Sequence, residues 1–229
     1  MSRLSITKAI QTIGRPVFTS REIALVAQGS LSTVSHSLER MARQGLIRKV
    51  MRGLWCAPSD PRFTPFLLVP FLAGSHQAYV SFLSGLNLHG MIEQIPQRTF
   101  CATTGHTRLR TTPVGAFSFH RIHPNFFVGF DWYRGGREFL IATPEKALVD
   151  SLYLSSRRGR QFRFFPEIDF GSGFRFRVAE DWASRIPYAR IRKYVQAQLE
   201  ALSRQRQPRR RRNTPESSPT KPATTRSRG

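Results

Sequence analysis

The sequence predicts an α+β protein with two folded parts and a basic tail. Residues 18–55 contain two short helical patterns followed at once by a basic, β-prone hairpin pattern. Residues 76–202 combine helical patterns with segments in which apolar and polar residues alternate, as in a mixed α+β domain. From Ser203 the chain is rich in Ser, Pro, Thr, Gln and Arg, which cannot build a core. The predicted organisation is a first domain over 1–60, a linker over 61–75, a second domain over 76–202 and a disordered Arg-rich tail over 203–229.

The chain is strongly basic, with 36 Lys and Arg against 14 Asp and Glu and a formal net charge of +22. Residues 203–229 hold nine of the basic residues and one acid, a charge of +8, which leaves +14 for residues 1–202. The folded part is therefore basic in its own right. This charge favours a polyanionic partner, and nucleic acid is the usual one.

Cysteine usage and hydropathy indicate a soluble protein of a reducing compartment. Cys56 and Cys101 are isolated and lack the CxxC spacing of a zinc cluster or a disulfide framework. The first residues lack the apolar core of a signal peptide, and no run reaches the roughly 18 apolar residues of a membrane span. We expect a cytoplasmic protein without a membrane partner.

The first domain begins with two helical patterns. Apolar residues recur near helical spacing over residues 4–13, and this helix must end before Pro16. Thr19 and Glu22 match a capping box, which predicts a second helix starting one or two residues after the threonine. Gly29 permits a sharp turn after it.

A third helix is predicted from Ser30–Ser32 to just before Gly45. Leu31, Val34, Leu38 and Met41 follow one another at steps of three, four and three residues, which gives a single apolar stripe. Short hydroxyl side chains at the start of the helix and arginines further along lie mostly on its other faces. Such a helix suits the DNA major groove, because small groups allow close approach while arginines hold the backbone. An ordinary solvated helix face is the alternative that this helix leaves open.

The segment after this helix favours DNA. Residues 46–55 contain two β-prone runs around a tight basic turn, and residues 1–60 carry nine basic residues against three acids. Helix, helix and basic hairpin in this order predict a winged helix-turn-helix that binds double-stranded DNA. The predicted DNA-contacting residues are Ser32, Thr33, His36, Ser37, Arg40, Arg43, Arg48, Lys49 and Arg52.

Residues 61–202 read as a packed connector followed by a compact domain. Phe66–Leu72 is apolar and too short to span a membrane, so we expect it in a core or an interface. A helix is predicted over 76–90, mostly antiparallel strands over 98–104, 114–122, 126–133 and 138–141, and helices over 143–154, 179–185 and 188–202. Gly135-Gly136 predicts a tight hairpin turn between two of the strands. Thr143 and Pro144 are a helix N-cap and first-turn proline.

No constellation of catalytic or metal-binding residues stands out. His120 and His123 lack further ligands, and the acids Asp131, Glu138, Glu145 and Asp150 are not spaced as a general acid/base pair. We interpret Glu145 and Asp150 as helix-dipole, surface or structural residues. The basic cluster Arg157–Arg160 is interpreted as a surface loop, with a nucleic-acid or partner contact as the alternative. We therefore expect no enzyme, no cofactor and no metal.

Two stretches of the second domain carry a resemblance to a known family. They are YVSFLSGLNLHG, from Tyr79 to Gly90, and ATPEKALVD, from Ala142 to Asp150, with Ile95-Pro96 between them. With the predicted first domain, they resemble the AbiEi family of antitoxins from type IV, abortive infection, toxin–antitoxin systems. The resemblance covers about residues 5–200 and does not include the Arg-rich tail.

The resemblance implies a bacterial or archaeal transcriptional regulator that represses its own operon through its first domain. It also implies that the second domain counteracts a nucleotidyltransferase-like toxin encoded alongside, without a stable complex between the two. Two alternatives stay open. One is a stand-alone regulator whose second domain dimerises or senses a ligand, and the other is a nucleic-acid-processing enzyme that uses Asp131, Glu145 or Asp150.

Overall fold

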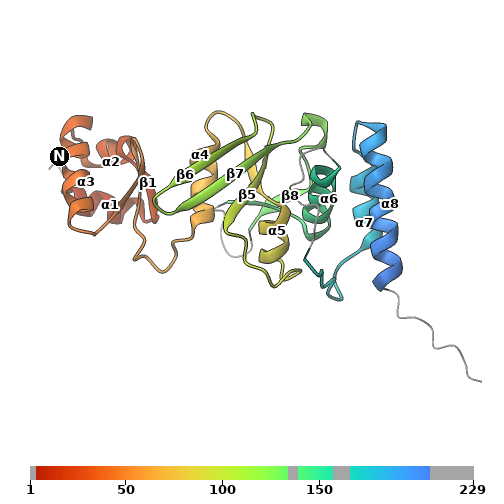
Figure 1. The fold of residues 1–229 in the computed structure, drawn as a ribbon. Coiled ribbons are helices and arrows are strands. Elements are labelled where there is room, and N and C mark those ends of the chain that lie inside the picture. The colour runs from red at the N-terminus through yellow and green to blue at the C-terminus, as the bar shows by residue number, and fades with distance from the viewer. Residues whose placement is uncertain (1–3, 134–138, 157–165, 207–229) are drawn as a thin grey trace, which may run out of the picture.

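Two β-sheets organise a mixed α+β fold. The computed structural model describes residues 4–133, 139–156 and 166–206, and these contain eight α-helices, a three-stranded sheet and a six-stranded sheet (Figure 1). The small sheet and three helices lie at one end of the molecule, and the last two helices lie at the other (Figure 1). No helix among the described residues is both long and apolar enough to cross a bilayer.

The N-terminal unit is built from local signals that the sequence displays. Its elements are α1 (Ile6–Ile13), β1 (Val17–Thr19), α2 (Ser20–Ala27), α3 (Leu31–Arg43), β2 (Arg48–Met51) and β3 (Leu54–Cys56). The predicted capping box of Thr19 and Glu22 is confirmed, with side chain and backbone bonded in both directions. The turn after α2 differs from the prediction, because Gln28 and not Gly29 takes the left-handed conformation (φ 53°). The strands run antiparallel in the order β1-β3-β2, and β1 was not predicted.

The N-terminal unit has its own small core. Phe18, Ile23, Leu38 and Trp55 are buried in it, so one strand, two helices and the hairpin all contribute. The indole N–H of Trp55 donates to the Ser20 hydroxyl over 2.8 Å, and both groups are buried. This bond joins β3 to the first residue of α2.

The segment predicted as a linker is largely folded. It contains a 3-10 helix, η1 (Pro65–Leu68), followed directly by the short helix α4 (Val69–Ala73). Leu67, Leu68 and Leu72 are buried in one cluster with residues of the small sheet and of the large sheet. The expectation that Phe66–Leu72 packs in a core or an interface is therefore confirmed for these leucines, and the second half of the segment 61–75 is folded. Its apolar side chains fill a core that the two parts of the molecule share.

The large sheet is mixed. Its strands are β4 (Ala78–Val80), β5 (Arg98–Thr103), β6 (Arg108–Thr112), β7 (Gly115–Arg121), β8 (Phe130–Trp132) and β9 (Leu140–Ala142), in the order β6-β7-β5-β4-β9-β8. Three pairings are antiparallel, and two, β5 with β7 and β4 with β9, are parallel. The prediction of mostly antiparallel strands is therefore right for three of the five pairings.

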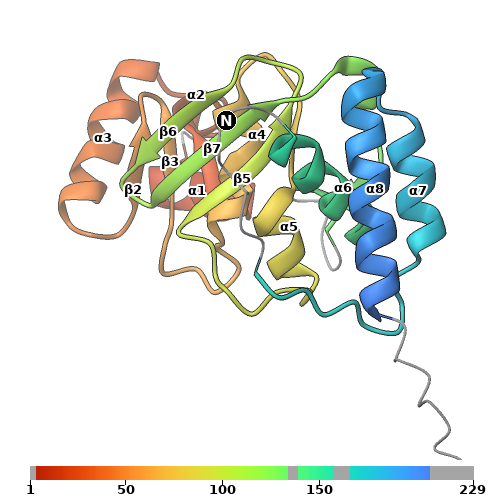
Figure 2. The same cartoon turned by 45° about the vertical axis from the view of Figure 1, so that its right-hand side comes forward.

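Helices cover both faces of the large sheet. The helices η2 (Pro124–Phe126), α5 (Phe82–Leu88) and α6 (Pro144–Ser155) share a core with one face, and α4 shares a core with the other. The helices α7 (Phe176–Ser184) and α8 (Ala189–Arg206) pack outside α6 (Figure 2). The large sheet therefore lies between the N-terminal unit and a layer of helices.

Some predicted elements of the second domain are wrong at their bounds. The first half of the predicted helix over 76–90 is strand β4, whose residues Ala78–Val80 are buried on both faces of the sheet. A short strand buried on both faces shows no alternation, so its pattern resembles a helix. Strand β6 was not predicted, and of the strand predicted over 126–133 only Phe130–Trp132 is extended.

The C-terminal boundary also differs. Helix α8 continues to Arg206, so the tail predicted to be disordered from Ser203 begins with four helical residues. Four predicted features lie outside the described residues: the remaining tail, the turn at Gly135-Gly136, Glu138 and the cluster Arg157–Arg160. The strands that flank the predicted turn, β8 and β9, do pair antiparallel.

Candidate functional site

Helix α3 presents a polar and basic face to solvent. Ser30 caps its N-terminus, and Val34 and Leu38 point into the core of the N-terminal unit. On the opposite side, the predicted DNA-contacting residues of this helix are exposed, except Ser37, which is half-buried. They are Ser32, Thr33, His36, Ser37, Arg40 and Arg43.

Two of these hydroxyl groups serve the helix itself. Thr33 Oγ1 lies 2.8 Å from the capping hydroxyl of Ser30, and the Ser37 hydroxyl donates to the Thr33 carbonyl oxygen over 3.0 Å. The side chains of His36, Arg40 and Arg43 form no hydrogen bond or ion pair with any described residue. The charged half of the α3 face is therefore available to an external partner.

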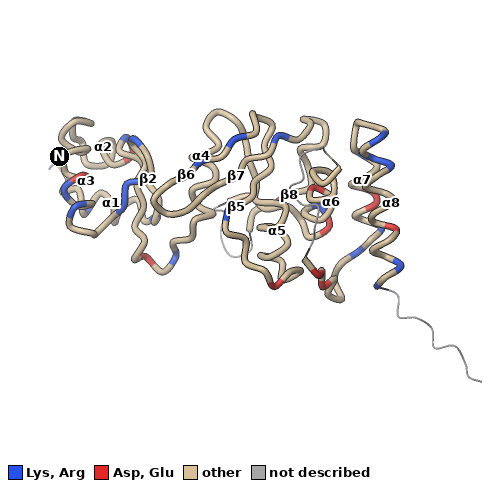
Figure 3. The backbone as a smooth tube through the Cα atoms, in the orientation of Figure 1, with Lys and Arg blue, Asp and Glu red and all other residues tan. Residues whose placement is uncertain are grey.

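The three predicted cations of the β2–β3 hairpin lie in different environments. Lys49 forms an ion pair with Glu39 of α3 and lies 5.5 Å from the centre of the Trp55 ring. The Arg48 guanidinium lies 3.5 Å from the Pro113 carbonyl oxygen, in the turn between β6 and β7. Only Arg52, in the tight turn, carries an exposed charge without a partner among the described residues. Basic residues thus mark α3 and β2 (Figure 3), although Glu39 neutralises one of them.

A second cluster of polar side chains lies in the core of the second domain. Tyr79, Ser81, Lys146 and Asp150 are all 0% exposed. The Asp150 carboxylate accepts from the Tyr79 hydroxyl over 2.9 Å, from the Ser81 hydroxyl over 2.7 Å and from the Lys146 ammonium. The Lys146 ammonium also donates to the Tyr79 hydroxyl over 3.0 Å. Each member therefore has a partner inside the cluster.

Local geometry explains why these residues meet. Lys146 and Asp150 are four residues apart on α6, so their side chains lie on the same face of the helix. Tyr79 lies in β4, and Ser81 is the extended residue directly after it, so the two side chains point to the same face of the sheet. That face is covered by α6.

The charges of this cluster are held in a dry environment. Burial lowers the pKa of Lys146, and the adjacent Asp150 carboxylate opposes that shift. Burial raises the pKa of Tyr79 well above its ordinary value, and the negative charge of Asp150 acts in the same direction. The Lys146 ammonium also lies 3.7 Å from the centre of the Phe126 ring, a cation–π contact. With no exposed atom, the cluster cannot touch a substrate, so we assign it to the cohesion of the domain.

Further contacts join the two stretches that carry the family resemblance. His89 Nε2 lies 2.7 Å from the Ala142 carbonyl oxygen. A Cβ atom added to Gly85 would lie 3.0 Å from the Cβ atom of Ala147, so α5 and α6 approach closely there. The stretches Tyr79–Gly90 and Ala142–Asp150 therefore pack against each other, although 51 residues separate them in the chain.

The structure separates the roles predicted for two acids of the second domain: the structural role fits, and the surface role does not. Glu145 and Asp150 are buried, so the surface role considered for them is wrong. Glu145 accepts from the backbone N–H of Arg175 over 3.2 Å, and Asp150 is a structural partner. The signal that could have revealed this is a Lys and an Asp four residues apart within the apolar run of α6. Asp131 is exposed on β8.

The two histidines considered as metal ligands have local partners. His120 is buried and its Nε2 atom lies 3.0 Å from the Ser118 hydroxyl, while His123 Nδ1 accepts from the backbone N–H of Asn125 over 3.2 Å. Over residues 4–133, 139–156 and 166–206, no group of three or more His, Cys, Asp or Glu side chains is placed to hold a metal ion. Cys56 and Cys101 are buried free thiols.

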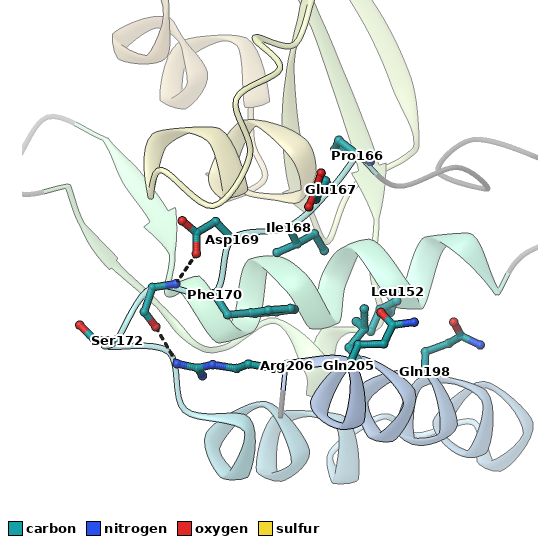
Figure 4. A pocket seen from close by; sticks show the side chains of 12 residues that line it. Leu152, Pro166, Glu167, Ile168, Asp169, Phe170, Ser172, Gln198, Gln205 and Arg206 are labelled. Atoms are coloured by element: carbon teal, nitrogen blue, oxygen red, sulfur yellow. Dashed lines mark hydrogen bonds between the residues drawn. The ribbon is translucent and has the colours of Figure 1, made fainter. Parts of the chain in front are cut away.

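A hollow lies between the segment 166–172, α6 and α8. Its volume is about 790 Å³, and twelve residues line it, including Leu152, Phe170 and Gln198 (Figure 4). The Arg206 guanidinium closes one end by donating to the Gly171 carbonyl oxygen over 2.9 Å (Figure 4). Its lining mixes carboxylate, amide and aromatic groups. It could therefore accept a small polar molecule.

Comparison with known proteins adds no assignment. No protein-family model matches the chain, and no curated protein matches it.

Proposed function

We propose that this protein is a DNA-binding antitoxin of a type IV toxin–antitoxin system. In this proposal the N-terminal unit is a winged helix-turn-helix, with α3 as the recognition helix and the β2–β3 hairpin as the wing. It represses the protein's own operon. The second domain counteracts a nucleotidyltransferase-like toxin, as in the AbiEi family, whose motifs the second domain resembles.

The exposed face of α3 is the observation that carries the DNA-binding part. Arg40, Arg43 and His36 lie on the side of the helix opposite Val34 and Leu38, and the basic turn at Arg52 follows in the adjacent hairpin. A helix that is anchored by its apolar stripe and exposes unpaired cations fits the DNA major groove. The net charge of +22 favours association with the same polyanion.

The antitoxin part rests on the resemblance of residues 79–90 and 142–150 to AbiEi antitoxins. The placement of these stretches supports a role in maintaining the domain's shape, because four of their polar side chains bond to one another in the buried cluster around Asp150. A binding function needs a fixed surface more than a reactive group. In this proposal, exposed residues that this core holds in place make the contact with the toxin or with the toxin's target.

DNA binding is tested with the full chain and a duplex taken from directly upstream of its gene. Replacing Arg40 and Arg43 with Ala should weaken DNA binding. The slope of log affinity against log salt concentration should become shallower by about 0.9 per lost phosphate contact. The control replaces Arg177 and Arg190 of α7 and α8, which are exposed and have no partner among the described residues, and it removes the same charge at the far end of the molecule. Equal effects of the two double variants would contradict the assignment of α3.

Antitoxicity is tested by producing the full chain together with the nucleotidyltransferase-like protein encoded next to it. The Arg40→Ala/Arg43→Ala variant should lose repression of the operon and still relieve growth arrest, because the two activities belong to different surfaces. The full chain is required, since the two parts share the core around Leu67, Leu68 and Leu72. Loss of rescue in this variant would refute the division of roles.

A stand-alone regulator is the second candidate, and the hollow of about 790 Å³ favours it. In this reading, a small polar molecule that binds between segment 166–172 and α8 changes the protein's affinity for DNA. A gene neighbourhood without a nucleotidyltransferase-like protein, combined with DNA binding, would favour this candidate over the antitoxin.

A further inference from the structure

A second hollow lies in the N-terminal unit, between the start of α2, the start of α3 and the β2–β3 turn. Its volume is about 530 Å³. The residues that line it are Thr19, Ser20, Arg21, Leu31, Ser35, Arg52 and Gly53. Two guanidinium groups therefore border one hollow, and one of them, that of Arg21, was not among the predicted DNA contacts.

The positive charge of this hollow is not neutralised by the part of the chain that the structure describes. Arg21 and Arg52 are exposed, and neither side chain forms a hydrogen bond or an ion pair there. Other cations nearby are neutralised: Arg15 pairs with Glu22, and Lys49 pairs with Glu39. The hollow is thus bordered by two cations of the N-terminal unit that no described residue neutralises.

The walls of the hollow are fixed to each other. The backbone N–H of Ser20, at the start of α2, donates to the Gly53 carbonyl oxygen of the β2–β3 turn over 2.9 Å. The bond from the Trp55 indole to the Ser20 hydroxyl, 2.8 Å long and buried, lies directly below. Because Arg21 and Arg52 each adjoin one of these anchored residues, their backbones keep a constant relative position. A site of this kind needs little reorganisation on binding.

We infer that Arg21 and Arg52 together bind one phosphate group of the DNA backbone. The inference rests on the proposed DNA-binding function and names two residues that hold the duplex. Guanidinium groups donate paired hydrogen bonds to phosphate oxygens, and the half-buried Ser35 adds a hydroxyl to the same hollow. In the inferred complex, the DNA strand that borders the groove occupied by α3 passes between this helix and the β2–β3 hairpin. The hollow opens there. Free inorganic phosphate has the same chemistry and is the competing occupant.

The experiment compares the full chain, Arg21→Ala/Arg52→Ala and the control Arg177→Ala/Arg190→Ala. Fluorescence anisotropy measures binding to the upstream duplex and to a random duplex of equal length over a series of salt concentrations. The upstream duplex is then remade with single phosphates replaced by neutral methylphosphonates, one position at a time. Binding of inorganic phosphate alone is followed by NMR shifts of the arginine side chains.

We expect the variant to lose affinity for DNA of any base sequence. In the Arg21→Ala/Arg52→Ala variant, the slope of log affinity against log salt concentration should become shallower by about 0.9 on both duplexes, because one phosphate contact is lost. The control should leave this slope unchanged. One methylphosphonate position should weaken binding of the unaltered protein and have no effect on the variant. That loss of response identifies the phosphate held by the two arginines.

Three results would overturn the inference in distinguishable ways. If the variant behaves as the control while the unaltered protein binds DNA, the phosphate site is wrong and the proposed function stands. If the unaltered protein binds neither duplex, the proposed function and the site both fall. If inorganic phosphate binds through Arg21 and Arg52 but the DNA salt slope does not change, the hollow is a site for free phosphate.

Discussion

The surface of the N-terminal unit and the core of the second domain use cationic side chains in opposite ways. In the N-terminal unit, Arg21, Arg40, Arg43 and Arg52 are exposed and have no partner among the described residues, so their charge is available to another molecule. In the second domain, Lys146 is fully buried and satisfied by Asp150 and Tyr79. Net charge alone therefore does not locate a binding surface. Burial and pairing decide which cations are open to a partner and which hold the fold together.

The largest expected effect comes from breaking the buried pair. Lys146→Ala should destabilise the protein by about 3–5 kcal/mol, because the Asp150 carboxylate is left buried without its counter-charge. Replacing both residues together, Lys146→Met with Asp150→Leu, should recover only part of that loss, because the buried Tyr79 and Ser81 hydroxyls then lose the carboxylate that accepts from them. The measurement is the free energy of unfolding in urea. The exposed pair of Arg204 and Glu200 is the control, and its removal should change stability by about 1 kcal/mol or less.

The second effect tests whether the two parts are independent. Leu68 is fully buried in the core shared by the small and large sheets, and Leu68→Ala should cost about 2–5 kcal/mol. Because this core is shared, the variant should still unfold in a single transition seen by tryptophan fluorescence and circular dichroism. Leu25→Ala, at a residue that is 81% exposed, is the control and should change stability by about 0.5 kcal/mol or less. Two separate transitions would show that the N-terminal unit and the second domain unfold independently.

The third effect concerns pH at the boundary between the parts. Burial raises the pKa of the Cys56 thiol from 9.0 to about 11. Between these values the unfolded chain loses this proton and the folded chain keeps it, so stability should fall by about 2 kcal/mol as pH rises from 9 to 11. Below pH 9 this contribution is fully present. Urea unfolding of Cys56→Ala at both ends of this window should show a smaller decline; an unchanged decline would assign it to other groups.

The smallest effect separates two cations of the same hairpin. Lys49 is paired with Glu39, whereas Arg52 has no partner among residues 4–133, 139–156 and 166–206. Lys49→Ala should therefore weaken DNA binding less than Arg52→Ala and should change stability by about 1 kcal/mol or less. Anisotropy titrations of the two single variants on one duplex give the comparison. A larger loss for Lys49→Ala would show that its pair with Glu39 opens when DNA binds.

The sequence predicts the N-terminal unit well because its signals are local. The capping box of Thr19 and Glu22 and the tight basic turn before Leu54 involve residues within a few positions of each other. The same holds for the start of α6, where the Thr143 hydroxyl accepts from the Lys146 backbone N–H as a helix cap. These features form wherever the segment lies, so no knowledge of distant residues is needed.

Other features depend on partners far along the chain. Strand β4 looks helical until β5 and β9 are seen on either side of it, and the parallel pairing of β5 with β7 has no signature in either strand. The hollow beside Arg21 requires the β2–β3 turn to fold back onto the start of α2. In the sequence alone, Arg21 is an ordinary residue in the first turn of α2.

By itself, the sequence determined the basic character of the protein, the helix–helix–hairpin order of its first part and the two motif stretches of its second. Only the tertiary structure decided that Tyr79 and Ser81 meet Lys146 and Asp150 in a dry core, and that Leu67, Leu68 and Leu72 join the two parts. The physical reason is that charge and periodicity are properties of neighbouring residues. Burial and pairing depend on which distant segments the fold brings into contact.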